Sequence, residues 1–291
     1  MQEYIDYIKT ILFFGLIGPF LLWIAKSNGF FRFPTVSHGK TYPVLFKHIL
    51  SVFAIYLGFT SLVAPFLGWV IESFYLSFLG KLPTEAVFSW VQLGLLSIIL
   101  LLFYLYSRMQ GPFFFKHLWK NRFIDSPQSI PKDFFMGVIT WFIGFPFVVL
   151  VGQCVDLILH VFFGFQNYEQ VAVRYLKTTL ESPEQLAVAL MTILLLAPCI
   201  EEFLFRGCLQ SFLKRHMTTK DAIVLSSLCF ALFHFSLSQG LGNISLCASL
   251  FVFALFLGFI YERQASLFAS VGLHITFNAV STGRILFFPE L

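Results

Sequence analysis

The chain has 291 residues, of which 58% are hydrophobic and only 12% are charged, whereas a soluble domain carries roughly 25% charged residues. Forty of the residues are phenylalanine. A single soluble core of this size cannot bury so much apolar surface, so the composition excludes a soluble enzyme, a disordered chain and a disulfide-stapled secreted domain. The formal net charge of +4 comes without a basic stripe and argues against a nucleic-acid partner. The composition therefore predicts an all-α, polytopic membrane protein with membrane lipid around it.

Eight stretches of the chain approach the length of about 20 apolar residues that a helix needs to cross a bilayer. In chain order these are residues 8–25, 49–71, 86–107, 134–163, 184–212, 222–238, 243–260 and 265–284. The first lacks the net-positive start and the small-residue cleavage site of a signal peptide, so we expect it to be retained. The fourth and fifth are longer than a simple span, so we expect each to tilt, break or extend past the membrane, with Pro146 and Pro198 as candidate break points. With no internal repeat, residues 1–291 are predicted to form one transmembrane domain.

The loop charges predict an orientation. Thirteen Lys and Arg residues lie in the loops 26–48, 108–133, 213–221 and 261–264, and five lie on the other side. By the positive-inside rule the side with thirteen is cytoplasmic, which puts both termini outside. We expect a multi-pass protein of the cell (inner) membrane.

Residues 166–177 mix charged and apolar residues at helical spacing. This pattern predicts a short amphipathic helix at the membrane interface. Such a helix either connects two spans or covers a substrate entry.

Three charged residues interrupt the fifth span. A charge at the bilayer centre costs about 2.5–3.5 kcal/mol on insertion scales. Glu202 and Arg206 are four apart, so they share a helix face and can pair. Glu201 points about 100° away from Glu202 because each helical residue turns by that angle. It needs a partner on another helix, a water-filled cavity or a proton, unless this segment is an interfacial helix end with its acids in water.

Two later spans also carry polar residues. His234 lies in the sixth, and His274 and Asn278 lie four apart on one face of the eighth. A carboxylate and a neutral histidine together can take a proton from water. A second histidine and an amide can donate hydrogen bonds to a developing oxyanion. The set is what hydrolysis of an amide or ester inside a membrane would need.

These elements resemble the motifs of the CAAX protease and bacteriocin-processing family, also called the Abi family of intramembrane proteases. Its EExxxR motif is matched by Glu201-Glu202-Phe-Leu-Phe-Arg206, and its FxxxH motif by Phe230-Ala-Leu-Phe-His234. Its last motif, a histidine followed four residues later by asparagine, is matched by His274 and Asn278. The resemblance implies about eight helices enclosing an intramembrane catalytic cavity, with the catalytic core within about 184–284.

The resemblance also implies roles for these residues. Glu201 and His234 would activate the attacking water, and His274 and Asn278 would stabilise the oxyanion. The supporting residues are Glu202 and Arg206, which would hold the motif helix, and Phe230, which would pack beneath the second motif. The substrate would be a protein or peptide, lipid-modified in the prenyl type, and no cofactor would be required.

Four other interpretations compete. Two histidines and a glutamate could bind zinc, but the chain has no HExxH motif and the histidines lie forty residues apart. A proton-coupled transporter would more often show internal repeats. A catalytically silent scaffold or immunity protein would tolerate loss of these polar residues. A serine or cysteine enzyme lacks support, because there is no GxSxG motif and the cysteines have no evident activating base.

Overall fold

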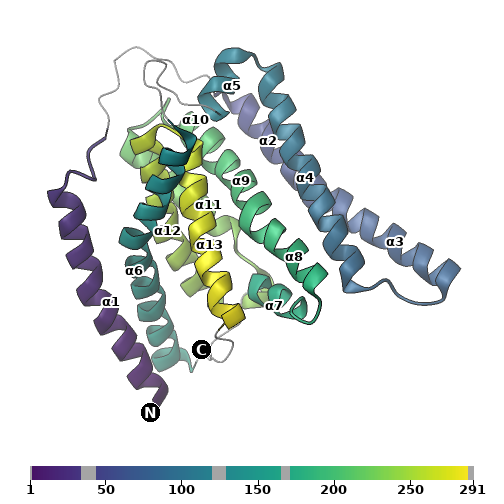
Figure 1. The fold of residues 1–291 in the computed structure, drawn as a ribbon, viewed down its shortest axis with the longest axis horizontal. Helices are drawn as coiled ribbons and strands as arrows, with labels where there is room; N and C mark the ends of the chain where they lie inside the picture. The colour runs from purple at the N-terminus through teal and green to yellow at the C-terminus, as the bar shows by residue number, and fades with distance from the viewer. Residues whose placement is uncertain (1, 34–43, 120–128, 165–170, 288–291) are drawn as a thin grey trace.

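The computed structural model describes residues 2–33, 44–119, 129–164 and 171–287, and these are helical with short connections (Figure 1). The first half contains α1 (Gln2–Ser27), α2 (Phe46–Gly58), a π-helical turn (Phe59–Val63), α3 (Ala64–Leu79), α4 (Glu85–Met109), α5 (Pro112–Trp119) and α6 (Ile130–Phe163). After α7 (Val171–Thr178) come α8 (Pro183–Met191), a π-helical segment (Thr192–Leu196), α9 (Ala197–Glu202), a second π-helical segment (Phe203–Gln210) and α10 (Ser211–Leu213). The chain ends with α11 (Thr219–Phe233), a short 3-10 turn (Leu237–Gln239), α12 (Gly242–Gln264) and α13 (Leu267–Phe287).

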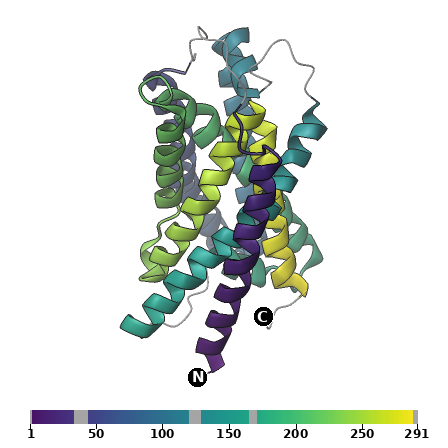
Figure 2. The ribbon, with the colours of Figure 1, turned by 90° about the vertical axis from the view of Figure 1, so that its left-hand side faces the viewer.

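The all-α, polytopic class is confirmed. Six helical stretches are long and apolar enough to cross a membrane. They are Tyr4–Ser27, Phe46–Leu79, Glu85–Met109, Ile130–Phe163, Pro183–Leu213 and Gly242–Gln264. The other two predicted spans correspond to α11, which has only 15 residues, and to α13, which carries the polar residues His274 and Asn278. Helix α1 begins and α13 ends at the same end of the bundle, as eight passes require (Figures 1 and 2).

Helix α6 is the centre of one half of the molecule. It has 34 residues, runs unbroken through Pro146, and packs against α1, α12 and α13. Three glycines on α6 let its neighbours approach closely. A Cβ at Gly137 would lie 2.3 Å from the Ala269 backbone oxygen, and one at Gly144 would lie 2.9 Å from the Phe256 ring. A Cβ at Gly152 would lie 2.6 Å from a serine hydroxyl of α12. Close backbone contact through small residues is a common way to pack membrane helices.

Helices α2, α3 and α4 form the opposite flank (Figure 1). Helix α3 has no buried residue, whereas α4 contacts α8 and α9 and α2 contacts the second π-helical segment. The apolar, exposed face of this flank is what a lipid-facing surface requires, since exposed Leu, Phe and Trp side chains there would be costly in water.

Two local expectations need correction. The predicted sixth span, 222–238, ends as a helix at Phe233, because Asn243 ties the chain back: its side chain accepts from the Ser236 N–H at 2.9 Å and donates to the Ser236 carbonyl at 2.7 Å. Pro146 does not break its helix. Of the amphipathic segment predicted at 166–177, residues 165–170 lie outside the described part, and α7 begins at Val171. All five cysteines are free, as expected.

Most of the loop cations gather at one end. The helix ends that carry them, among them the ends of α1 and α12 and the start of α6, lie together at the end drawn uppermost in Figure 1. This agrees with the charge asymmetry read from the sequence. That this end faces the cytoplasm stays a prediction.

Candidate active site

The helix that carries the two glutamates is irregular because of Pro198. In the π-helical segment before it, the Ala197 N–H bonds to the carbonyl of Thr192, five residues earlier. In that register the Ile193 carbonyl would need the N–H of Pro198, which proline lacks. The side chain of Asn278 on α13 fills this position, with its Nδ2 donating to the Ile193 oxygen at 2.9 Å. Asn278 therefore joins α13 to the helical stretch Pro183–Leu213, called the motif helix, about two turns before Glu201.

Glu202 and Arg206 form a fully buried ion pair. Both side chains are sealed from solvent, and Arg206 Nη1 lies 3.0 Å from Glu202 Oε1. The guanidinium also donates from Nη2 to the Ala254 carbonyl at 3.3 Å and lies 4.4 Å above the centre of the Phe230 ring. This confirms the i, i+4 pairing expected from the sequence, and it links the motif helix to α11 and α12.

His274 lies between the two carboxylates. Its Nδ1 is 2.9 Å from Glu202 Oε1, the same oxygen that accepts from Arg206, and its Nε2 is 3.9 Å from Glu201 Oε2. Because Glu202 is paired with Arg206 as a carboxylate, the His274 Nδ1 is the donor in this bond. Glu202 thus holds His274 in a fixed orientation with Nε2 toward Glu201.

His234 approaches Glu201 from the other side. It is the residue that ends α11, and its Nδ1 lies 2.8 Å from the Phe230 carbonyl oxygen. A carbonyl only accepts, so Nδ1 carries the proton and Nε2 is left for other contacts. That Nε2 lies 3.6 Å from Glu201 Oε2.

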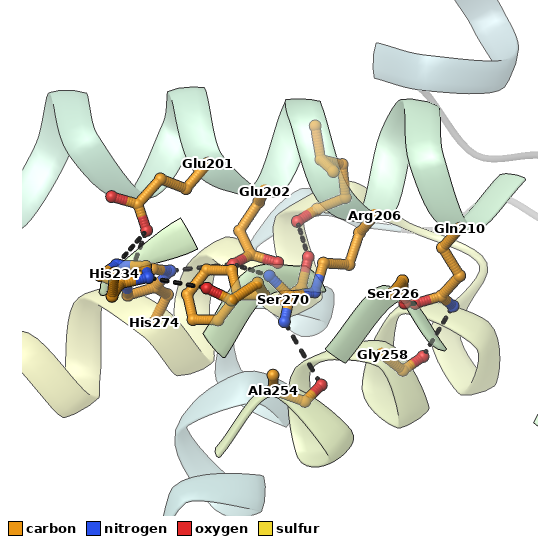
Figure 3. Close-up of polar contacts among 12 residues, drawn as sticks. Glu201, Glu202, Arg206, Gln210, Ser226, His234, Ala254, Gly258, Ser270 and His274 are labelled. Atoms are coloured by element: carbon orange, nitrogen blue, oxygen red, sulfur yellow. Dashed lines mark hydrogen bonds and ion pairs between the residues drawn. The ribbon is translucent and has the colours of Figure 1, made fainter. Parts of the chain in front are cut away.

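Three atoms therefore converge: Glu201 Oε2 and the Nε2 atoms of His234 and His274 (Figure 3). Glu201 Oε2 is buried and meets the distance and angle criteria of a hydrogen bond with no atom of the described residues. The side chains of Glu201 and His234 are 17% and 29% exposed, whereas Glu202 is completely covered. At 3.6–3.9 Å these atoms are too far apart for direct hydrogen bonds but close enough to share one water molecule. The adjacent glutamates thus differ in environment: the Glu201 side chain is partly accessible to solvent, whereas the Glu202 side chain is not.

Sequence reasoning missed a second polar network beyond Arg206. Gln210 donates to Glu262 Oε1 at 2.8 Å and to the Gly258 carbonyl at 3.2 Å, and it accepts from Ser226 (Figure 3). Glu262 also pairs with Lys214 at 2.6 Å. The sequence signal that could have revealed this network is spacing, because Gln210 follows Arg206 by four residues and so lies on the same face of the same helix. The network clamps the motif helix to α12.

The predicted site residues are thus all brought to one region, on the motif helix, α11 and α13. Among the described residues no group of three or more His, Cys, Asp and Glu side chains has the arrangement of a metal site. Cys208, next to the motif, is fully buried.

Residues 183–280 match the family model described as type II CAAX prenyl endopeptidase, Rce1-like. The match includes all seven residues singled out from the sequence and confirms the resemblance that they carry. No curated protein and no solved structure matches the chain.

Proposed function

We propose that this protein is a metal-independent, glutamate-dependent intramembrane endopeptidase of the CAAX prenyl protease and bacteriocin-processing type. The observation that carries the proposal is the convergence of Glu201 Oε2 with the Nε2 atoms of His234 and His274 at 3.6 and 3.9 Å. The family match over residues 183–280 supports the same conclusion. It concerns a third of the chain, so the activity rests mainly on the site.

The reaction begins with a water molecule held by Glu201 and His234. His234 has its proton on Nδ1, engaged with the Phe230 carbonyl, so its Nε2 accepts one water hydrogen while Glu201 Oε2 accepts the other. The water oxygen attacks the carbonyl carbon of the scissile amide, and its proton passes to Glu201. Glu201 then delivers that proton to the leaving nitrogen as the C–N bond breaks.

The geometry gives His274 a different role. Its Nδ1 donates to Glu202, which fixes the ring, and its Nε2 lies 3.9 Å from Glu201 Oε2. With a proton on Nε2, this atom would donate a hydrogen bond to the oxyanion of the tetrahedral intermediate.

Asn278 would assist in the same step. One hydrogen of its Nδ2 is held by the Ile193 carbonyl at 2.9 Å, and the second is free to donate. The bond to Ile193 fixes the direction of the amide, which is the preorganisation that oxyanion stabilisation depends on.

The substrate we propose is a membrane-associated protein or peptide. If the protein acts as the prenyl type does, this substrate carries a covalently attached lipid. The two glutamates lie within the stretch Pro183–Leu213, which is long and apolar enough to span the membrane, so an apolar or lipid-bearing chain can reach the site from the bilayer. Extended backbone is needed at the cleavage position, because a helical peptide keeps its carbonyls bonded.

The test is cleavage of a mixed library of prenylated and plain peptides by the purified protein, with cut sites read by mass spectrometry. The Glu201→Gln variant is the blank, and Glu181→Gln, the same change at an exposed position, is the matched control. We expect wild type and Glu181→Gln to cut and Glu201→Gln to be inactive, with no effect of a chelator. Activity of Glu201→Gln would exclude Glu201 as the base, and loss of cleavage with chelator would establish a zinc site on the same atoms.

A further inference from the structure

A cationic hollow lies at the basic end of the bundle, away from the glutamate site. It has a volume of about 450 Å³, and its lining residues come from the segments at the end of α1, the start of α6 and the end of α12. Its lining residues are Gly29, Arg32, Phe33, Lys132, Met136, Arg263 and Gln264. Three of the seven are cations, and none is an acid. Ala254, which meets Arg206, lies nine residues before Arg263 on α12, about 13 Å along the helix.

The structure holds one of these cations in place. Arg263 donates from Nε to the Phe30 carbonyl at 2.6 Å, and its guanidinium lies 4.5 Å above the centre of the Phe30 ring. The two terminal nitrogens of the guanidinium therefore stay available in a fixed orientation. A guanidinium presented in this way suits the bidentate contact with phosphate oxygens.

The backbone also shapes the hollow around Arg32. Gly29 has a φ of +68°, and the Arg32 N–H bonds back to the Gly29 carbonyl at 3.2 Å. A Cβ at Gly29 would lie 3.3 Å from Arg32 Nε, so the absence of a side chain there lets the guanidinium fold over the turn. The turn thus places Arg32 beside the hollow without an ion-pair partner among the described residues.

The two acidic residues nearest in sequence offset the charge of this cluster only in part, through the attraction between Asp133 and Lys132. Glu262, which precedes Arg263, is buried and paired with Lys214 at 2.6 Å. Asp133, which follows Lys132, is buried and hydrogen-bonded to Ser266. Among the described residues the three cations of the hollow therefore outnumber the one nearby carboxylate that acts on them, and an anion bound there would relieve the repulsion among its cations.

We infer that this hollow is a binding site for a phosphate-bearing anion, and that its place at the membrane end of three helices suits the headgroup of an anionic lipid. Basic pockets between transmembrane helices are suited to such headgroups. The apolar side chains of Phe33 and Met136 complete the lining and can contact the glycerol and upper acyl carbons. Nothing in this inference depends on the proposed peptidase activity.

The test is calorimetric titration of the detergent-purified full chain with three ligands: dihexanoyl phosphatidylglycerol, dihexanoyl phosphatidylcholine and inorganic phosphate. The test variant is Arg32→Gln/Lys132→Gln. Its matched control is Lys47→Gln/Lys220→Gln, which removes the same charge at exposed positions of the same end, outside the hollow. Arg32 and Lys132 are exposed, so both double variants should fold, which gel filtration and circular dichroism confirm.

We expect wild type to bind phosphatidylglycerol and not phosphatidylcholine, and the test variant to bind it about thirtyfold more weakly. The affinity of the control variant for phosphatidylglycerol should fall by less than about threefold. Similar binding of inorganic phosphate, lost in the same variant, would support the site and identify a free anion as its ligand. The inference fails if wild type binds neither phosphatidylglycerol nor phosphate, or if it binds phosphatidylcholine equally well. It also fails if the two double variants lose the same affinity for phosphatidylglycerol.

Discussion

The buried pair of Glu202 and Arg206 allows a quantitative test of what holds the site together. Replacing Glu202 by Ala removes the acceptor of Arg206 Nη1 at 3.0 Å and of His274 Nδ1 at 2.9 Å. Arg206 then keeps only the Ala254 carbonyl at 3.3 Å and the face of Phe230 at 4.4 Å. It would be a buried charge with no carboxylate at hydrogen-bond distance, attracted only by the more distant Glu201.

Removing one partner of a buried ion pair costs about 3–5 kcal/mol. We expect a loss of stability in the upper part of that range, because His274 also loses its acceptor. The cation–π contact of Arg206 with Phe230 offsets at most about 2 kcal/mol of the loss. A melting temperature falls by about 2–4 °C per kcal/mol in domains of 150–250 residues, so Glu202→Ala should melt about 10 °C below wild type. Glu202→Gln keeps an acceptor oxygen and should lose less.

The assay is thermal unfolding in one detergent, followed by tryptophan fluorescence, with the exposed variant Glu181→Gln as control. The double variant Glu202→Leu/Arg206→Met removes both charges and should melt above either single variant, because no unpaired charge remains. A wild-type melting temperature for Glu202→Ala, or additive losses in the double variant, would refute the ion pair as the cause.

Two further predictions concern activity and packing. His234→Ala and Asn278→Ala should each lower kcat by about 10²-fold or more with a near-native fold, as measured by initial rates and circular dichroism; turnover near wild type would remove that residue from the mechanism. Gly137→Ala should lower both the melting temperature and kcat, because its Cβ would lie 2.3 Å from an α13 backbone oxygen and displace the helix that carries His274. Gly283→Ala, on α13 with nothing within 4 Å, should leave both unchanged, and equal losses in the two glycine variants would contradict this account.

The order of the helices and the pairing within the motif helix could be predicted from the sequence, because both depend on local periodicity. Eight apolar stretches predicted the helical order, of which six are long and apolar enough to span, and an i, i+4 spacing predicted the ion pair of Glu202 with Arg206. For Glu201 the sequence predicted a partner on another helix, a water-filled cavity or a proton, without deciding among them. Which histidine would bond to which glutamate was not, since it depends on how α13 packs against the motif helix.

Backbone irregularity was the feature least accessible to prediction. Hydropathy is the same for α- and π-helical segments, so neither π-helical segment of residues 183–213 could be anticipated. Pro198 marked a break, but the bond from Asn278 to the Ile193 carbonyl follows only from the shifted register. The end of α11 at Phe233 was missed for a related reason, because the Asn243 side chain that ties back the chain lies ten residues later.

The glycine face of α6 has a consequence for how the bilayer assembles this protein. Lipid tails are as apolar as leucine, so burying apolar side chains gives two membrane helices little reason to associate, and close van der Waals contact must provide it. Gly137, Gly144 and Gly152 lie seven and eight residues apart, so one side of α6 receives α13 and then α12 at backbone distance. A larger residue there would leave the sequence as hydrophobic as before and every span intact. The place of His274 beside the glutamates is thus determined in part by the missing side chain of Gly137, on a different helix.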